Sequence, residues 1–219
     1  MITLYGFGRV HRPVIGETRD LRAQWALEET GLPYRVHGLD HTAGELDGPA
    51  YSRISCFHLV PVIDDEGFIV AESAAVLLYL AEKAGTLIPP DFEGRMRVIQ
   101  WCFAALTTVE RPLMEIQMID KFGSGEGAEN RRAEMVKEAG RWLDGLERRL
   151  DGREWIACAD FTVADILLAS VLREIRKTDL IDPYPRLKAY YARALARPAW
   201  QRALSLYAER LGVTVADIH

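Results

Sequence analysis

Residues 60–73 read VPVIDDEGFIVAES, and this stretch decides the fold. Its apolar runs at 60–63 and 68–70 predict two short strands, joined by a hairpin turn over residues 64–67. An apolar pattern with helical spacing follows over residues 72–84. We therefore expect a strand pair that leads into a largely buried helix, with Pro61 inside the first strand.

The residues around this hairpin have the chemistry to hold a small peptide. Because proline has no N–H to donate, Pro61 is tolerated only where the strand edge is open, and an open edge beside Val60 can pair with an extended peptide. Ser73 begins a helix, where its hydroxyl and the free N–H groups form an anion site, and Glu72 can hold an ammonium group. Together these features describe a small zwitterionic peptide ligand. Each motif alone is more commonly structural, with Pro61 ending a strand and Ser73 capping a helix.

The segment before the hairpin alternates between strand and helix. Apolar residues at 2–5 predict a first strand, residues 19–30 suit a helix closed by Gly31 and Pro33, and residues 34–39 predict a second strand. Residues 40–49 form a polar loop. The order is β-α-β, a poorly defined middle, and then β-β-α.

The second half of the chain predicts helices only. Two consecutive prolines, Pro89 and Pro90, mark a linker, and every periodic segment beyond it has helical spacing. We expect an α/β domain over 1–84, a linker over 85–92 and an all-helical domain over 93–219. Residues 161–166, FTVADI, predict one helix start in detail, with Thr162 as N-cap, Asp165 completing a capping box, and Phe161 and Ile166 at the staple positions.

Composition excludes several classes of function. The 219 residues carry 27 basic and 32 acidic side chains, a net charge of −5, so the chain lacks the basic excess that a nucleic-acid-binding protein needs. It has no long uncharged apolar run and no N-terminal secretory pattern. The three cysteines are widely spaced without a CxxC pair, and the five histidines show no HExxH spacing, so we expect a reduced, cytoplasmic protein with no metal site.

The sequence resembles the cytosolic glutathione transferases over nearly its whole length. The resemblance rests on motifs that occur in the family's order and at its separations, namely residues 4–6 (LYG), 25–34 (WALEETGLPY), 60–65 (VPVIDD), 72–80 (ESAAVLLYL) and 161–165 (FTVAD). It implies a thioredoxin-like N-terminal domain, an all-helical C-terminal domain and a homodimer. It also implies glutathione as co-substrate, with the glutathione thiol attacking a small electrophile, a peroxide or a disulfide.

The same resemblance implies roles for particular residues. Pro61 would be cis, the backbone of Val60 would pair with the cysteinyl part of glutathione, and Glu72 and Ser73 would hold its γ-glutamyl end. The family's thiolate-stabilising hydroxyl aligns with Thr18, counted back from residues 22–25. A plain N-cap role for Thr18 is about equally well supported. Tyr5 is the alternative donor, although strand packing is the more common role for such a tyrosine.

Three departures from the family pattern qualify this assignment. The loop over residues 8–17 is longer than usual, which affects the alignment of Thr18 and brings Arg9, His11 and Arg12 near the site. Leu59 replaces the residue that usually contacts the glycyl end, so His58 or His41 is a candidate substitute. No cysteine occupies the active position. A non-catalytic module on the same fold, binding glutathione or a protein partner, is therefore the alternative interpretation.

Overall fold

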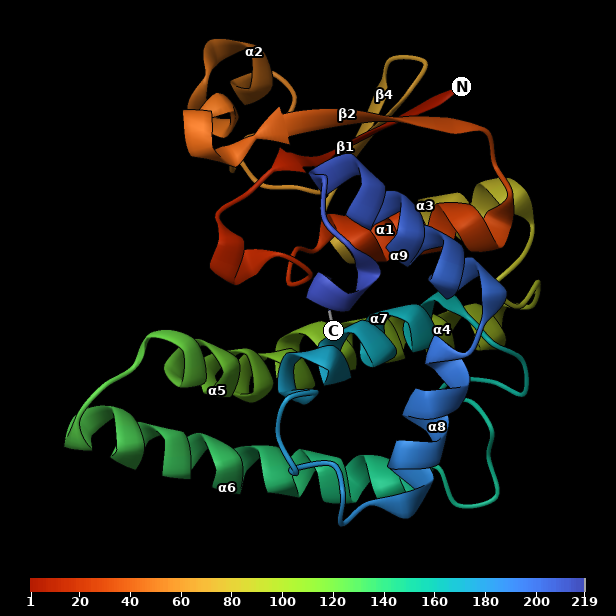
Figure 1. Cartoon of the computed structure of the whole chain (residues 1–219). Coiled ribbons are helices and arrows are strands. Elements are labelled where there is room, and N and C mark those ends of the chain that lie inside the picture. Colours follow the sequence, from red (N-terminus) through yellow and green to blue (C-terminus); the bar gives the residue numbers. More distant parts are fainter. Residues whose placement is uncertain (219) are drawn as a thin grey trace. The chain divides into compact units, whose positions relative to one another are not determined.

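The computed structural model describes residues 1–218 of the chain, which divide into two compact units (Figure 1). The first unit contains residues 1–86 together with the segment that begins at residue 197, and the second contains residues 87–196. The fold class is the expected one, a thioredoxin-like α/β domain followed by helices. The domain boundaries differ from the expected ones in one respect. The segment from residue 197 on belongs to the first unit, because its helix α9 packs against α1 of that unit.

The first unit is built on a mixed four-stranded sheet in the order β2-β1-β3-β4. Its strands are β1 (Ile2–Arg9), β2 (Tyr34–Asp40), β3 (Val62–Asp65) and β4 (Phe68–Ala71). The strands β1 and β2 are parallel, whereas the β1–β3 and β3–β4 pairs are antiparallel. The first strand therefore runs four residues further than expected, and β3 begins only after Pro61, so this proline lies before the ladder and not inside it.

Two helical layers cover the sheet. The helices of this unit are α1 (Asp20–Thr30), α2 (Pro49–Ser52), α3 (Ser73–Ala84) and α9 (Pro198–Leu211). Side chains alternate along β1, so Ile2, Leu4 and Gly6 face α1, while Tyr5 and Phe7 face a cluster that includes Tyr51 of α2. Figure 1 shows α1, α3 and α9 together on one side of the sheet and α2 on the other.

Apolar contacts join α9 to this unit. The indole rings of Trp25 on α1 and Trp200 on α9 are buried, with centroids 4.8 Å apart. Salt bridges at the edge of this contact join Arg197 to Glu29, and Arg202 to Glu28, with N···O distances of 2.6 and 2.9 Å.

All of the regular secondary structure described in the second unit is helical. It contains α4 (Phe92–Phe103), the π-helical stretch Ala104–Val109, α5 (Glu110–Phe122), α6 (Glu126–Arg149), α7 (Val163–Leu172) and α8 (Pro185–Leu195). Every residue of α7 is buried, so this helix forms the centre of the unit. None of the helices described is long and apolar enough to cross a membrane.

The start of α7 has the capping box that the sequence predicts. The carboxylate of Asp165 accepts hydrogen bonds from the backbone N–H of Thr162 at 2.8 Å, from its hydroxyl at 2.9 Å, and from the backbone N–H of Ile156 at 2.9 Å. The Tyr190 hydroxyl on α8 adds a bond at 3.1 Å. Because Asp165 is fully buried, these donors replace the water that the carboxylate loses on folding.

We predict that Thr162→Ala lowers the free energy of unfolding by about 1–2 kcal/mol, because it removes one capping bond and one donor to a buried carboxylate. Denaturant unfolding followed by circular dichroism measures this. Thr162→Ser keeps the hydroxyl and should stay within about 0.5 kcal/mol of the unchanged protein. Equal stability of the alanine and serine variants would show that the bond contributes nothing.

Candidate active site

The expected site residues converge at the carboxyl end of β1. In the sheet register Tyr5 lies opposite Val62, and Val62 lies opposite Ala71. Pro61 and Glu72 each come one residue beyond these pairs, so both lie at this end of the sheet. The helix α1 is tied to the same place, because the backbone N–H of Phe7 donates to Asp20 at 3.0 Å.

The segment around Pro61 has the backbone form that the family resemblance implies. The Val60–Pro61 peptide is cis, Pro61 is buried and Val60 is half-buried. The carbonyl of Leu59 accepts hydrogen bonds from the hydroxyls of Tyr51 at 2.8 Å and Ser55 at 3.1 Å. These bonds hold the chain just before Pro61, so the backbone of Val60 is presented by a well-anchored loop.

Glu72 and Ser73 stand at the start of α3. Glu72 occupies the N-cap with a φ of 71°, a left-handed conformation that is uncommon outside glycine, and its exposed side chain makes no capping bond. Ser73 is buried as the first residue of the helix. The first turn of α3 carries no acidic side chain, so its free N–H groups and the Ser73 hydroxyl can bind a carboxylate. The Glu72 carboxylate can bind an ammonium group.

Thr18 lies just before α1 and pairs with a tyrosine from the end of the chain. The N-cap of α1 is Arg19, so the expected N-cap role of Thr18 is wrong for this helix. The Thr18 hydroxyl lies 2.6 Å from the hydroxyl of Tyr207 on α9, and the Tyr207 oxygen also accepts the backbone N–H of Gly16 at 3.3 Å. Thr18 itself is half-buried, so it keeps access to solvent.

The protonation state of Tyr207 suggests the direction of this bond. Burial raises the pKa of the Tyr207 phenol well above its usual range, with the negative charge of Asp20 as the next cause, so the phenol keeps its proton. When Tyr207 accepts from Gly16 and donates to Thr18, both of its contacts are satisfied. The hydroxyl proton of Thr18 is then free to donate to a third group, and a hydroxyl that already accepts a bond is the stronger donor.

A buried ion pair fixes α1 and α9 around this position. Asp20 is fully buried, and its Oδ2 atom lies 2.8 Å from Nη2 of Arg210. Arg210 also donates to the Phe7 carbonyl and to Gln24, both at 2.8 Å. A Cβ atom at Gly6 would come within 2.6 Å of Asp20 Oδ2, so glycine is required where β1 passes this carboxylate.

Tyr5 is positioned for packing. Its ring lies 5.1 Å from the ring of His37 and 5.9 Å from that of Tyr51, on the sheet face opposite to α1. Together with Leu39 and Ile54, these residues line a cavity of about 350 Å³ under α2. Tyr5 therefore has the environment of a strand residue that packs in a small hydrophobic core.

The candidate histidines and Arg9 each contact another side chain in the structure. Nδ1 of His58 lies 3.0 Å from the Asp47 carboxylate, and His58 has a φ of 55°. Arg9 lies 3.7 Å from Asp40, and the rings of His11 and His41 meet edge-on at 5.5 Å. Among the described residues, no group of three or more His, Cys, Asp or Glu side chains could hold a metal ion.

Two family models match the chain, those of the glutathione S-transferase N-terminal domain at residues 21–83 and C-terminal domain at 117–202. A glutathione transferase structure from Burkholderia graminis, with two glutathione molecules bound per subunit, is 30% identical and superposes with a TM-score of 0.80, covering 93% of this chain and 87% of that one.

The chain belongs to the glutathione S-transferase family. Glutathione S-transferase F9 of Arabidopsis thaliana is 27% identical over 85% of this chain and 92% of its own length. The Escherichia coli disulfide-bond oxidoreductase YfcG is 27% identical over 81% of this chain and 86% of its own.

Sequence reasoning missed Tyr207, Arg210 and Asp20. Tyr207 and Arg210 are separated from their partners by about 190 residues, and their helical spacing marks only a buried face of α9. An aspartate in the first turn of α1 is ordinary helix chemistry. No local signal distinguishes these residues from structural ones.

Proposed function

We propose that this protein is a glutathione transferase in which Thr18 stabilises the glutathione thiolate. A free thiol has a pKa of about 8.5 and is mostly protonated at neutral pH, so a donor that lowers this pKa makes the nucleophile. The observation that carries the proposal is the contact between Thr18 and Tyr207, which can leave the threonine proton free at the start of α1. The packing of Tyr5 against His37 and Tyr51 favours Thr18 over Tyr5.

The other expected site residues, which lie at the same end of the sheet, would hold glutathione as co-substrate. In the proposal, the backbone of Val60 beside Pro61 pairs with the cysteinyl unit. The free N–H groups of α3 and the Ser73 hydroxyl take the γ-glutamyl carboxylate, and Glu72 takes its ammonium group. His58, oriented by Asp47, is the candidate partner for the glycyl carboxylate, since the neighbouring Leu59 has no polar side chain.

The reaction follows from the thiolate. The thiol proton passes to solvent, the sulfur forms a bond to an electrophilic carbon, oxygen or sulfur atom, and the leaving group departs with the electron pair of the broken bond. The Burkholderia relative with two bound glutathiones and the E. coli disulfide-bond oxidoreductase make a disulfide a specific candidate acceptor. Turnover of an aryl halide, a hydroperoxide and a small disulfide, measured side by side, assigns the reaction type.

The alternative is a binding module without catalysis. It would be retained on glutathione resin and bind glutathione in calorimetry, yet would turn over none of these substrates. For the intact protein we propose a cytoplasmic location, which the three free cysteines support.

We predict that Ser73→Ala weakens glutathione binding about 10- to 100-fold, because it removes one hydrogen bond to a charged carboxylate. Isothermal titration calorimetry measures the affinity. Ser205→Ala is the matched control, since it removes an exposed helical hydroxyl that donates to the Gln201 carbonyl of the same helix. An unchanged affinity in Ser73→Ala would remove this residue from the site.

We predict that Thr18→Ala lowers turnover near neutral pH roughly 100-fold while most of the glutathione affinity remains. Loss of the donor raises the pKa of the bound thiol, so activity should recover in part as the pH rises. Thr18→Ser keeps the hydroxyl and should stay active. Activity across pH 6–10 and the ultraviolet absorbance of the bound thiolate provide the two measurements.

Two further variants sharpen this test. Tyr207→Phe removes the donor to Thr18 but leaves the Thr18 hydroxyl, so it should raise the bound thiol's pKa by less than Thr18→Ala does. Thr86→Ala, an exposed threonine of the same unit, is the matched control. Normal turnover of Thr18→Ala together with loss of activity in Tyr5→Phe would transfer the role to Tyr5.

We propose that the protein is a homodimer in which the α/β unit of one subunit faces the helical unit of the other. Each unit exposes apolar rings that a partner could cover. Phe68 on β4 is 59% exposed, and Phe92 and Phe103 on α4 are 69% and 64% exposed. Single exposed apolar side chains are common on protein surfaces, so the family resemblance carries this proposal and these rings supply the positions at which to test it.

We predict a dimeric mass in sedimentation velocity at micromolar concentration and a shift toward the monomer in Phe68→Glu, because a charge would be buried in the interface. Phe122→Glu, which changes an exposed ring at the end of α5, is the matched control. A monomeric mass of the unchanged protein over the whole concentration range would contradict the proposal.

A further inference from the structure

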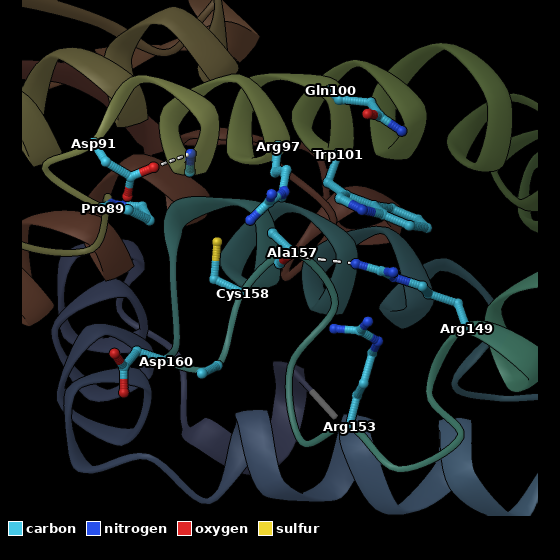
Figure 2. Close-up of a pocket in the computed structure, with 12 residues that line it drawn as sticks. Pro89, Asp91, Arg97, Gln100, Trp101, Arg149, Arg153, Ala157, Cys158 and Asp160 are labelled. Carbon is cyan, nitrogen blue, oxygen red and sulfur yellow. Dashed lines mark hydrogen bonds between the residues drawn. The ribbon is translucent and has the colours of Figure 1, made fainter.

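The helical unit contains a polar cavity of about 740 Å³ (Figure 2). Its walls come from the segment over residues 89–101, which includes most of α4, from the end of α6 and the loop after it, and from the segment over residues 157–160. All of its lining residues belong to the second unit, so the cavity is separate from the site at the end of β1. Its volume lies within the range of small-molecule binding pockets.

Three arginines from separate segments line this cavity. Arg97 comes from α4, Arg149 from the last turn of α6, and Arg153 from the loop that follows. Figure 2 shows their guanidinium groups directed toward a common space, with Asp91 and Asp160 displaced to one side of the view. The cavity therefore gathers positive charge where these three segments meet.

Arg149 is held in place by the protein itself. Its Nε atom donates to the Ile156 carbonyl at 3.0 Å, and Nη2 donates to the Ala157 carbonyl at 3.4 Å. The guanidinium carbon lies 5.4 Å from the centre of the Trp101 ring. These contacts orient the group without neutralising it, because carbonyls and an aromatic ring carry no net charge.

The positive charge of the cavity is only partly compensated. Among residues 1–218, Arg149 and Arg153 form no ion pair with a carboxylate, and Arg97 has only an exposed pair with Glu93 at 3.1 Å. Two carboxylates also line the cavity, Asp160 and Asp91, and Asp91 caps α4 through the Gly94 N–H at 2.8 Å, so three arginines face two acidic side chains. Burial is the main cause that lowers the pKa of the Arg149 guanidinium, and the nearby charges of Arg153 and Arg97 lower it further.

We propose that this cavity is a binding site for a small organic anion with at least two negative charges, carried by carboxylate or phosphate groups. The planar fork of a guanidinium matches both kinds of group with paired hydrogen bonds. A bound polyanion would offset the repulsion between the three arginines, and its oxyanions would be held against a cation that the protein has already oriented.

Calorimetry with citrate and with pyrophosphate tests the proposal, at constant ionic strength set with sodium chloride. We expect saturable binding of at least one probe. Arg97→Gln and Arg153→Gln should each weaken it about tenfold, the effect of losing one charge-assisted hydrogen bond, and the double variant about 100-fold. Arg148→Gln, which removes a neighbouring exposed arginine that does not line the cavity, should change the affinity less than twofold.

Cys158 reports where the probe binds. Its thiol lines the cavity, and burial raises its pKa, so it is a neutral and slowly alkylated group. A bound probe should slow alkylation of Cys158 several-fold in the unchanged protein, measured by mass spectrometry. Exposed Cys56, in the other unit, is the internal control and should react at an unchanged rate.

The outcomes separate the possibilities. Binding of citrate alone assigns a carboxylate ligand, binding of pyrophosphate alone assigns a phosphate ligand, and binding of both supports the shared oxyanion chemistry. No saturable binding of either probe at millimolar concentration, or binding that the Arg97→Gln/Arg153→Gln variant retains, overturns the proposal. Glutathione affinity should be unchanged in these variants, so the result is independent of the transferase assignment.

Discussion

The carboxylate of Asp20 is fully buried and forms an ion pair with Arg210, at 2.8 Å on the last turn of α9. Transfer of two charges from water into a protein interior is costly unless their geometry and remaining hydrogen bonds are good. Here the Phe7 N–H donates to Asp20, and Arg210 donates to the Phe7 carbonyl and to Gln24. The end of β1, the start of α1 and the end of α9 are therefore fixed to one another by a single network.

This network also sets the electrostatics of the proposed thiolate site. An uncompensated carboxylate two residues after Thr18 would repel a thiolate bound there, and the Arg210 charge removes that repulsion. Tyr207 precedes Arg210 by three residues, so both side chains lie on the same face of α9. The helix that neutralises Asp20 is thus the helix that orients the Thr18 hydroxyl, and the two effects depend on the same packing of Trp25 against Trp200.

Local sequence signals predicted local structure well, and they failed where structure depends on distant residues. The hairpin at 64–67 and the capping box at Thr162 were predicted because turn chemistry and cap spacing act over a few residues. Likewise, α1 and α3 end at Gly31 and Gly85, which adopt left-handed conformations. The placement of α9 with the first unit was not predicted, because its apolar face is equally compatible with either unit. For the site, the resemblance predicts binding roles for Pro61 and Ser73. It does not predict Tyr207, whose contact with Thr18 spans 189 residues.

The arginines of this protein differ in whether a carboxylate neutralises them. Those with a carboxylate partner hold the fold, and those without one are available to a ligand. Arg210 has a buried carboxylate and two further acceptors, so its hydrogen-bonding capacity is used in holding the fold. Arg149 is equally well oriented, but its acceptors are neutral carbonyls, and Arg153 beside it has no carboxylate partner in the part of the chain described. A fold gains nothing from gathering like charges around a solvent-open cavity, and their repulsion opposes folding. The arrangement becomes favourable once an anion occupies the cavity, because the attraction of each arginine to the anion then offsets the repulsion between the arginines.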